Sequence, residues 1–247
     1  MSKKIIVTIL LMICFLFQFE LSAKAGDYKN IGSGWSNVGG MASLDGKLYI
    51  ISGGILYETG KDGKYKNIGS GWSEIGGMAS LDGKLYIISG GILYETGKDG
   101  KYKNIGSGWS NVGGMASLDG KLYIISGGIL YETGKDGKYK NIGSGWSEIG
   151  GMASLDGKLY IISGGILYET GKDGKYKNIG SGWSNVGGMV SLDGKLYIIS
   201  GGILYETGKD GKYKNIGSGW SEIGGMASLD GKLYIISGGI LYMTESK

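Results

Sequence analysis

The strongest constraint on this chain is a 37-residue unit that repeats six times without interruption. The six tryptophans mark the units, at Trp35, Trp72, Trp109, Trp146, Trp183 and Trp220. Six units make 222 residues, the whole chain after residue 25, so no linker or second domain is expected. Repeats of this length are typical of solenoids, helical arrays and propellers, and the residues within one unit decide among them.

The unit favours short strands over helix. The chain holds 53 glycines, and they interrupt each repeat before two helical turns could form. Asp45-Gly46 and Gly53-Gly54 are two-residue hairpin signals, and Lys61–Lys64 contains a third turn. The strands predicted from these turns in the first full unit are residues 38–44, 47–52, 54–59 and 64–68. Each unit is therefore a meander of four antiparallel strands.

One strand of the unit separates a propeller from a one-sided sheet. In the run after Lys47, Leu48 and Ile50 lie on one face while Tyr49 and Ile51 lie on the other, and both faces are apolar. A strand with one solvated face would alternate apolar and polar residues. Each sheet therefore needs a neighbour on both sides, and the small residues of 38–44 suit the crowded innermost strand. The fold class predicted is all-β, a six-bladed β-propeller of four-stranded antiparallel blades.

The two ends of the repeat array predict how the ring closes. Residues 28–31 resemble an outermost strand without its own blade, and residues 240–244 end the last unit after its third strand. Pairing the first segment with the last completes the sixth sheet and leaves only short outer edges. We therefore expect the N-terminal strand to complete the last blade.

The first 25 residues have the pattern of a secretory signal peptide. Lys3 and Lys4 precede an apolar run over residues 5–19, and small residues before Gly26 suit cleavage near Ala25-Gly26. The run is shorter than the roughly 20 residues of a membrane span. The domains expected are a signal peptide at 1–25 and one propeller at 26–247, secreted or held in the periplasm or at the cell surface. Lipidation at Cys14 is a less favoured alternative.

The composition after residue 25 narrows the chemistry. Residues 26–247 contain no His, Arg or Cys, and 23 Lys against 21 Asp and Glu give a net charge of +2. Histidine triads, cysteine nucleophiles, zinc sites and a basic nucleic-acid surface are therefore not expected. The Asp-Gly turns offer too few oxygens for calcium. We expect no cofactor, no metal site and no catalytic residue.

Carboxylates keep one enzymatic alternative open. Each repeat offers Asp45, Glu58 and Asp62 or their equivalents, and glycosidases use paired carboxylates. Asp45 and Asp62 precede Gly in turns, where Asp is favoured for local reasons. Six equivalent sites also argue against a catalyst, because acid and base need different environments. The expectation is that the chain is not an enzyme.

The loop between successive units carries the candidate binding residues. Sugar sites combine an aromatic platform with hydrogen-bonding groups, and residues 32–36 supply one Trp and two Ser beside flexible glycines. The alternative is that the Trp only packs between blades. The third residue of the Trp-Ser-Asn-Val or Trp-Ser-Glu-Ile sequence alternates between Asn and Glu and is expected to face water. The predicted sugar-binding residues are Trp35, Trp72, Trp109, Trp146, Trp183, Trp220, Ser33, Ser70, Ser107, Ser144, Ser181 and Ser218.

The run YKNIGSGWSNVGGMASLDGKLYIISGGILYE resembles the repeat of tachylectin-2-type propeller lectins and, more loosely, the tectonin repeat. That resemblance implies binding of N-acetylated amino sugars between adjacent blades, on Ser33, Trp35 and their equivalents. The chain departs from that family in having six shorter repeats instead of five and Gly-Gly-Met-Ala in the inner strand. The function expected is a monomeric, multivalent lectin for glycans, with up to six sites and no membrane span. The alternative is a non-catalytic surface scaffold or antigen that binds protein.

Overall fold

The computed structural model describes residues 28–244, and every regular element in that range is a β-strand. The predicted signal peptide lies outside the described residues. The strands are β1 (Tyr28–Ser33), β2 (Val38–Leu44), β3 (Lys47–Ser52), β4 (Ile55–Thr59), β5 (Tyr65–Ser70), β6 (Ile75–Leu81), β7 (Lys84–Ser89), β8 (Ile92–Thr96), β9 (Tyr102–Ser107), β10 (Val112–Leu118), β11 (Lys121–Ser126), β12 (Ile129–Thr133), β13 (Tyr139–Ser144), β14 (Ile149–Leu155), β15 (Lys158–Ser163), β16 (Ile166–Thr170), β17 (Tyr176–Ser181), β18 (Val186–Leu192), β19 (Lys195–Ser200), β20 (Ile203–Thr207), β21 (Tyr213–Ser218), β22 (Ile223–Leu229), β23 (Lys232–Ser237) and β24 (Ile240–Thr244).

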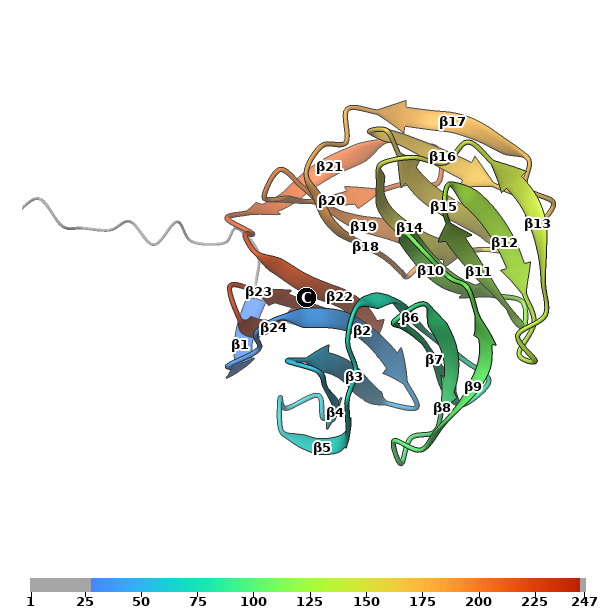
Figure 1. Ribbon diagram of the computed structural model, residues 1–247. Helices are drawn as coiled ribbons and strands as arrows, with labels where there is room; N and C mark the ends of the chain where they lie inside the picture. Colours follow the sequence, from blue (N-terminus) through green and yellow to red (C-terminus); the bar gives the residue numbers. More distant parts are fainter. Residues whose placement is uncertain (1–27, 245–247) are drawn as a thin grey trace, which may run out of the picture.

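These strands form six four-stranded antiparallel sheets arranged in a ring (Figure 1), which confirms the predicted six-bladed propeller. We number the blades along the chain. Blade 1 is β2–β5, blade 2 is β6–β9, blade 3 is β10–β13, blade 4 is β14–β17, blade 5 is β18–β21, and blade 6 is β22–β24 with β1. The first strand of each blade is the innermost, and these inner strands contact one another around the ring.

The ring closes as the two chain ends predicted. Strand β1 pairs antiparallel with β24, with Tyr28 opposite Thr244 and Ser33 opposite Ile240. The N-terminal strand therefore supplies the outermost strand of blade 6. One end of the chain completes the sheet that the other end builds.

Two strands of the first full unit have bounds that differ from the sequence prediction. The third strand begins at Ile55 because Gly54 stays in the hairpin with a positive φ of 77°. The fourth strand, predicted over 64–68, begins one residue later, at Tyr65. It ends two residues further on, at Ser70, because a bulge between Asn67 and Gly69 lets pairing continue. The Gly69 amide donates a hydrogen bond to Oδ1 of Asn67 at 3.0 Å, which stabilises the bulge.

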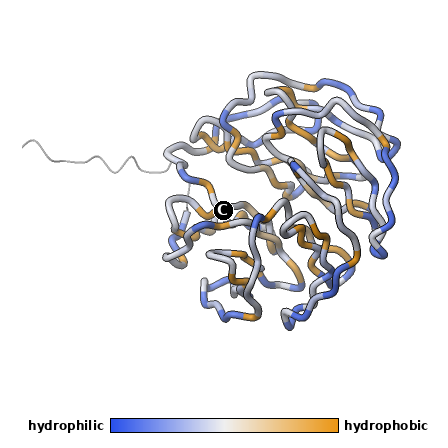
Figure 2. Tube along the Cα trace, in the orientation of Figure 1, coloured by the Kyte–Doolittle hydropathy of each residue, from blue (hydrophilic) through white to orange (hydrophobic). Residues whose placement is uncertain are grey.

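The hydrophobic core lies between the blades, one cluster to each boundary. Leu48 and Ile50 pack toward blade 6, where they meet Ile236, while Tyr49 and Ile51 pack toward blade 2. All four side chains of this strand are at most 1% exposed. Figure 2 shows the apolar segments gathered inside the ring and the hydrophilic ones along its turns. Burial of each such side chain stabilises the fold by about 1.5–3 kcal/mol, and the two-faced pattern predicted from the sequence is confirmed.

Glycine in the inner strands is what allows the blades to approach. A Cβ at Gly113 would lie 2.6 Å from Cγ1 of Ile149 in the next blade. A Cβ at Gly76 would lie 2.9 Å from Cβ of Val112. Real Cβ atoms do not come this close, so a larger residue would push neighbouring blades apart.

The two ends of the blades differ in chemistry, and we name them for their connections. The loop face carries the Trp loops and the Gly-Gly hairpins, which are joined by a hydrogen bond from the Gly53 amide to the Asn37 carbonyl at 3.3 Å. The turn face carries the Asp-Gly turns. The two kinds of connection lie on opposite faces because strands of a meander alternate in direction.

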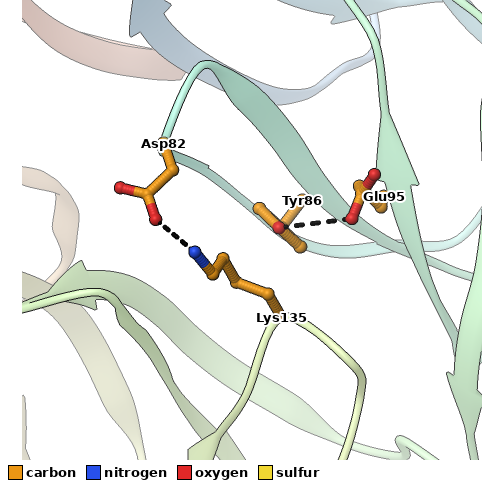
Figure 3. A network of polar contacts seen from close by, with 4 residues as sticks. All are labelled: Asp82, Tyr86, Glu95 and Lys135. Carbon is orange, nitrogen blue, oxygen red and sulfur yellow. Dashed lines mark hydrogen bonds and ion pairs between the residues drawn. The ribbon is translucent and has the colours of Figure 1, made fainter.

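On the turn face, ion pairs join neighbouring blades. Lys135 of blade 3 contacts Asp82 of blade 2 at 2.6 Å, and Tyr86 donates a hydrogen bond to Glu95 at 3.5 Å (Figure 3). The same Lys-Asp pair recurs at five of the blade boundaries, including Lys61 with Asp230 where blade 1 meets blade 6. Exposed pairs of this kind contribute at most about 1 kcal/mol each, so the apolar core provides most of the cohesion.

The tyrosines of this network predict how stability responds to alkali. Burial, helped by the carboxylate of Glu95, raises the pKa of Tyr86 to about 12 from 10.0. Burial, helped by the equivalent glutamate of each blade, also raises the pKa of Tyr49, Tyr123 and Tyr160 to about 12. A raised folded-state pKa means that the stabilising contribution is complete below pH 10 and is lost as the pH rises through 12.

We therefore expect the free energy of unfolding to fall between pH 10 and pH 12, measured by urea denaturation across that range. Replacing Tyr49, Tyr86, Tyr123 and Tyr160 by Phe should make the fall shallower, because Phe does not titrate. The matched control replaces the exposed Tyr65, Tyr102, Tyr139 and Tyr176 by Phe, and its pH profile should follow that of the parent chain. Equal slopes in both variants would refute the assignment.

A second expectation tests the close approach of the blades. Gly113→Ala should lower the free energy of unfolding by about 1–3 kcal/mol through overpacking against Ile149. Gly143→Ala is the control, because a Cβ there would have only ordinary contacts, at 3.7 Å or more. Thermal and urea unfolding would measure both variants. Similar stabilities for the two variants would show that the inner strands can accommodate a Cβ atom without overpacking.

Candidate functional site

The structure places the predicted Trp residues at the loop face, in the connection between one blade and the next. The Trp72 amide donates a hydrogen bond to the Gly54 carbonyl at 3.1 Å, and the other Trp loops make the equivalent bond. A second bond holds each loop to the blade that follows it, because the Ser52 hydroxyl of blade 1 donates to the Ser36 carbonyl in the Trp35 loop at 2.7 Å. Each Trp loop is thus fastened to a Gly-Gly hairpin of the preceding blade.

The indole rings are packed inside the molecule. All six Trp side chains are only 3–6% exposed. The Trp35 ring meets Tyr57 at a centroid distance of 5.5 Å and Tyr65 at 5.1 Å, both edge-on, and the two tyrosines meet each other at 5.3 Å. Such aromatic contacts stabilise a core by about 0.5–1.5 kcal/mol each beyond burial. The position of the ring therefore matches the packing alternative.

The predicted Ser residues end the outermost strands and come close to the Trp rings. Ser107 and Trp109 line a small cavity of about 40 Å³ together with Ser126. This space can hold a water molecule, whereas small-molecule sites measure about 300–1,000 Å³. As ligand contacts the predicted Trp and Ser residues stay a prediction; the structure gives the Trp rings a packing role.

Larger cavities open on the loop face at three blade boundaries. Their volumes are about 420 Å³ between blades 3 and 4, 550 Å³ between blades 4 and 5, and 510 Å³ between blades 6 and 1. Trp183, Ser184 and Asn185 line the second of these from blade 5, and Glu148 and the hairpin Gly164-Gly165 line it from blade 4. These volumes fall in the range of small-molecule sites.

The alternation of Asn and Glu makes two kinds of cavity. Glu148 faces Asn185 across one boundary, and Glu222 faces Asn37 across another, so the preceding blade supplies the carboxylate. Between blades 3 and 4 the order is reversed, with Asn111 before Glu148. The sequence prediction that these residues face water is confirmed, since all are exposed. Their place on the cavity walls was missed, although the alternation itself was a visible signal.

These residues also have an unusual backbone conformation. Asn37, Asn111 and Asn185 have φ of 47°, and Glu74, Glu148 and Glu222 have φ of 46–47°. Asn tolerates this left-handed region, but Glu does not share that tolerance, and the conformation costs roughly 1–2 kcal/mol. Strain of this kind concentrates at functional sites. The three glutamates are therefore the strongest functional candidates on the loop face.

Metal ligands do not gather among the described residues. Within residues 28–244, no group of three or more His, Cys, Asp or Glu side chains is placed to hold a metal ion. In the described part of the chain, no helix is long and apolar enough to cross a membrane. Of the residues that the structure describes, glutamate is the only charged type on the walls of the three cavities.

No known protein family and no curated protein matches this sequence. Several solved structures share the fold. A gluconolactonase from Xanthomonas campestris matches with a TM-score of 0.73 at 15% identity, over 90% of this chain and 91% of its own. A luciferin-regenerating enzyme matches with a TM-score of 0.72 at 13% identity, over 89% and 95%. Virginiamycin B lyase from Staphylococcus aureus, in a variant described as catalytically inactive because a His is replaced by Ala, matches with a TM-score of 0.62 at 14% identity, over 88% of each chain.

These matches correct the function predicted from the sequence. The fold is shared with proteins described as enzymes, and nothing specific to tachylectin-type lectins supports the proposed resemblance. The predictions of a glycan-binding lectin, of a non-catalytic scaffold and of a chain that is not an enzyme are therefore wrong. The physical reason for the error is that one Trp and two Ser per repeat were interpreted as a sugar platform, while the folded chain buries the indole.

The strained glutamates give a prediction about stability. Replacing Glu74, Glu148 and Glu222 by Asn, the residue of the alternate repeats, should raise the free energy of unfolding by about 1 kcal/mol or more in total. Urea denaturation would measure the change. The control replaces Glu58, Glu95 and Glu132 by Asn, and it should lose stability because those glutamates form ion pairs with Lys66, Lys103 and Lys140. A loss of stability in the first variant would show that the loop-face glutamates serve the fold.

Proposed function

We propose that this chain is an enzyme that hydrolyses a small cyclic ester in the loop-face cavities, with Glu148 and Glu222 as general bases and Glu74 in the equivalent position. The observation that carries the proposal is the cavity itself. Each of the three cavities joins one Glu to an Asn of the adjacent blade in a space of 420–550 Å³.

The residues on the walls suit ester hydrolysis. The carboxylate of Glu148 accepts a proton from a water molecule, whose oxygen attacks the carbonyl carbon of the ester. The negative charge that develops on the carbonyl oxygen is stabilised by hydrogen bonds from an amide group, for which Asn185 is the donor. The ring C–O bond then breaks, and the carboxylic acid returns the proton to the departing alkoxide. The product is a hydroxy acid.

The proteins that share this fold support the choice of reaction class. One is described as a gluconolactonase and another as virginiamycin B lyase. The lyase is described as inactive when a particular histidine is replaced, but this chain contains no histidine. Among the titratable groups of residues 28–244, only glutamate lines the cavities, so the base in this proposal is a carboxylate.

The alternation of Glu and Asn answers the symmetry objection raised by the sequence. Six identical sites would give acid and base the same surroundings. The two residue types instead reduce the sixfold repeat to a threefold one, and they place a carboxylate opposite an amide at the three boundaries that hold cavities. Export to the periplasm, the cell surface or the medium remains part of the proposal through the signal-like residues 1–25.

The test is hydrolysis of gluconolactone by the purified chain, followed as acid release at constant pH against the spontaneous rate. Replacing Glu74, Glu148 and Glu222 by Gln should lower kcat/KM by about 100-fold, the usual contribution of a general base. The matched control replaces Glu58, Glu95 and Glu132 by Gln, which removes three carboxylates from the blades without touching the cavities, and its kcat/KM should stay unchanged.

Two results would overturn the proposal. A parent chain that adds nothing to the spontaneous rate for gluconolactone or for an unsubstituted γ-butyrolactone would exclude lactone hydrolysis. An active chain whose rate survives the loss of the three loop-face glutamates would exclude their role as bases.

A further inference from the structure

The two faces of the propeller carry opposite charge. Every lysine of residues 28–244 occupies one of four repeat positions, those of Lys47, Lys61, Lys64 and Lys66. Each of these positions lies within three residues of the glycine in an Asp-Gly turn, and therefore belongs to the turn face or the adjoining outer rim. The loop face has only three charged side chains in the described part of the chain, Glu74, Glu148 and Glu222.

Among the described residues, the loop-face carboxylates also form no ion pair. The ion pairs of the described residues join lysines to turn-face aspartates or to the glutamates of the third strands, such as Glu58 and Glu206. Within that same range, none of them includes a loop-face glutamate. A carboxylate without a partner cation, in a cavity partly walled by protein, attracts cations more strongly than one in open water.

We infer that the substrate of these cavities carries a positive charge, as an amino-substituted cyclic ester does. The inference rests on the proposed function for the reaction and adds the class of substrate. An ammonium group would lie against the glutamate on one wall of a cavity. The ester carbonyl would accept a hydrogen bond from the asparagine amide on the opposite wall. Each cavity has one glutamate on its wall. Because a carboxylate has two acceptor oxygens, one oxygen can accept a hydrogen bond from the ammonium while the other accepts the proton of the attacking water.

The wall composition favours this choice over an anionic or an apolar substrate. An anion would find no lysine on the cavity walls and would be repelled by the glutamate. An apolar substrate would leave the exposed Asn and Ser groups of the walls without partners. A small polar cation is attracted by the glutamate and offers partners to the polar groups of the walls. Its ammonium group can donate hydrogen bonds to Glu and to the Asn side-chain oxygen.

Kinetics with three γ-butyrolactones of equal size would test the charge preference, the ring bearing an ammonium, a hydroxyl or a carboxylate group. We expect kcat/KM for the ammonium compound to exceed that for the hydroxyl compound by about tenfold at low salt, and the carboxylate compound to be the poorest. The advantage should shrink as salt is raised, because ions screen exposed charges. Equal kcat/KM for the three compounds would overturn the inference and leave the hydrolase proposal standing.

Binding measurements separate the two proposals further. The corresponding lactams resist hydrolysis, so calorimetry with the ammonium and hydroxyl lactams reports affinity alone. The ammonium lactam should bind about tenfold more tightly, and that advantage should vanish when Glu74, Glu148 and Glu222 are replaced by Gln, but persist when Glu58, Glu95 and Glu132 are.

The lactam measurements distinguish the charge preference from the proposed reaction. Selective binding without lactone hydrolysis would support the charge preference and reject the proposed reaction. Equal binding of both lactams, or a preference that survives in the loop-face Gln variant, would reject the charge preference.

Discussion

The need to bury two apolar faces of every blade governs this molecule. Leu48 and Ile50 turn to one neighbouring blade while Tyr49 and Ile51 turn to the other, so no blade can be stable alone. Six blades satisfy the requirement only as a closed ring, in which β1 completes the sheet of β24. The ion pairs between Lys and Asp lie on the turn face, but exposed charge pairs are too weak to hold the blades together.

The same glycines that let the blades approach also shape the cavities. Gly150 has no side chain because Val186 of the next blade occupies the space where a Cβ would go. Gly150, Gly164 and Gly165 then form part of the cavity wall toward the loop face. Gly150 therefore both allows the close approach of the next blade and leaves room for the cavity at the loop face. The cavities thus result from the same small residues that the close packing of the blades requires.

The outcome for the aromatic residues shows how burial can reverse an interpretation. One Trp per repeat beside two Ser is a reasonable pattern for a sugar platform, and nothing local in the sequence distinguishes it from a packing residue. In the folded chain, Tyr57 and Tyr65 meet the ring of Trp35 edge-on and exclude water from it. The alternating Asn and Glu, which looked like surface tolerance, instead meet across the blade boundaries.

The sequence by itself determined the fold almost completely: the repeat length, the two-residue turns and the apolar faces of 47–52 required four-stranded blades, and the chain ends required closure through β1. These are local or periodic properties, and identical units repeat them six times. Tertiary structure alone decided the site. Glu148 and Asn185 are 37 residues apart, and only the ring brings them to one cavity. Both residues also have a positive φ, which their residue types do not predict. Burial of the Trp rings likewise depends on contacts between different strands, because a side chain's exposure is set by the neighbour packed against it.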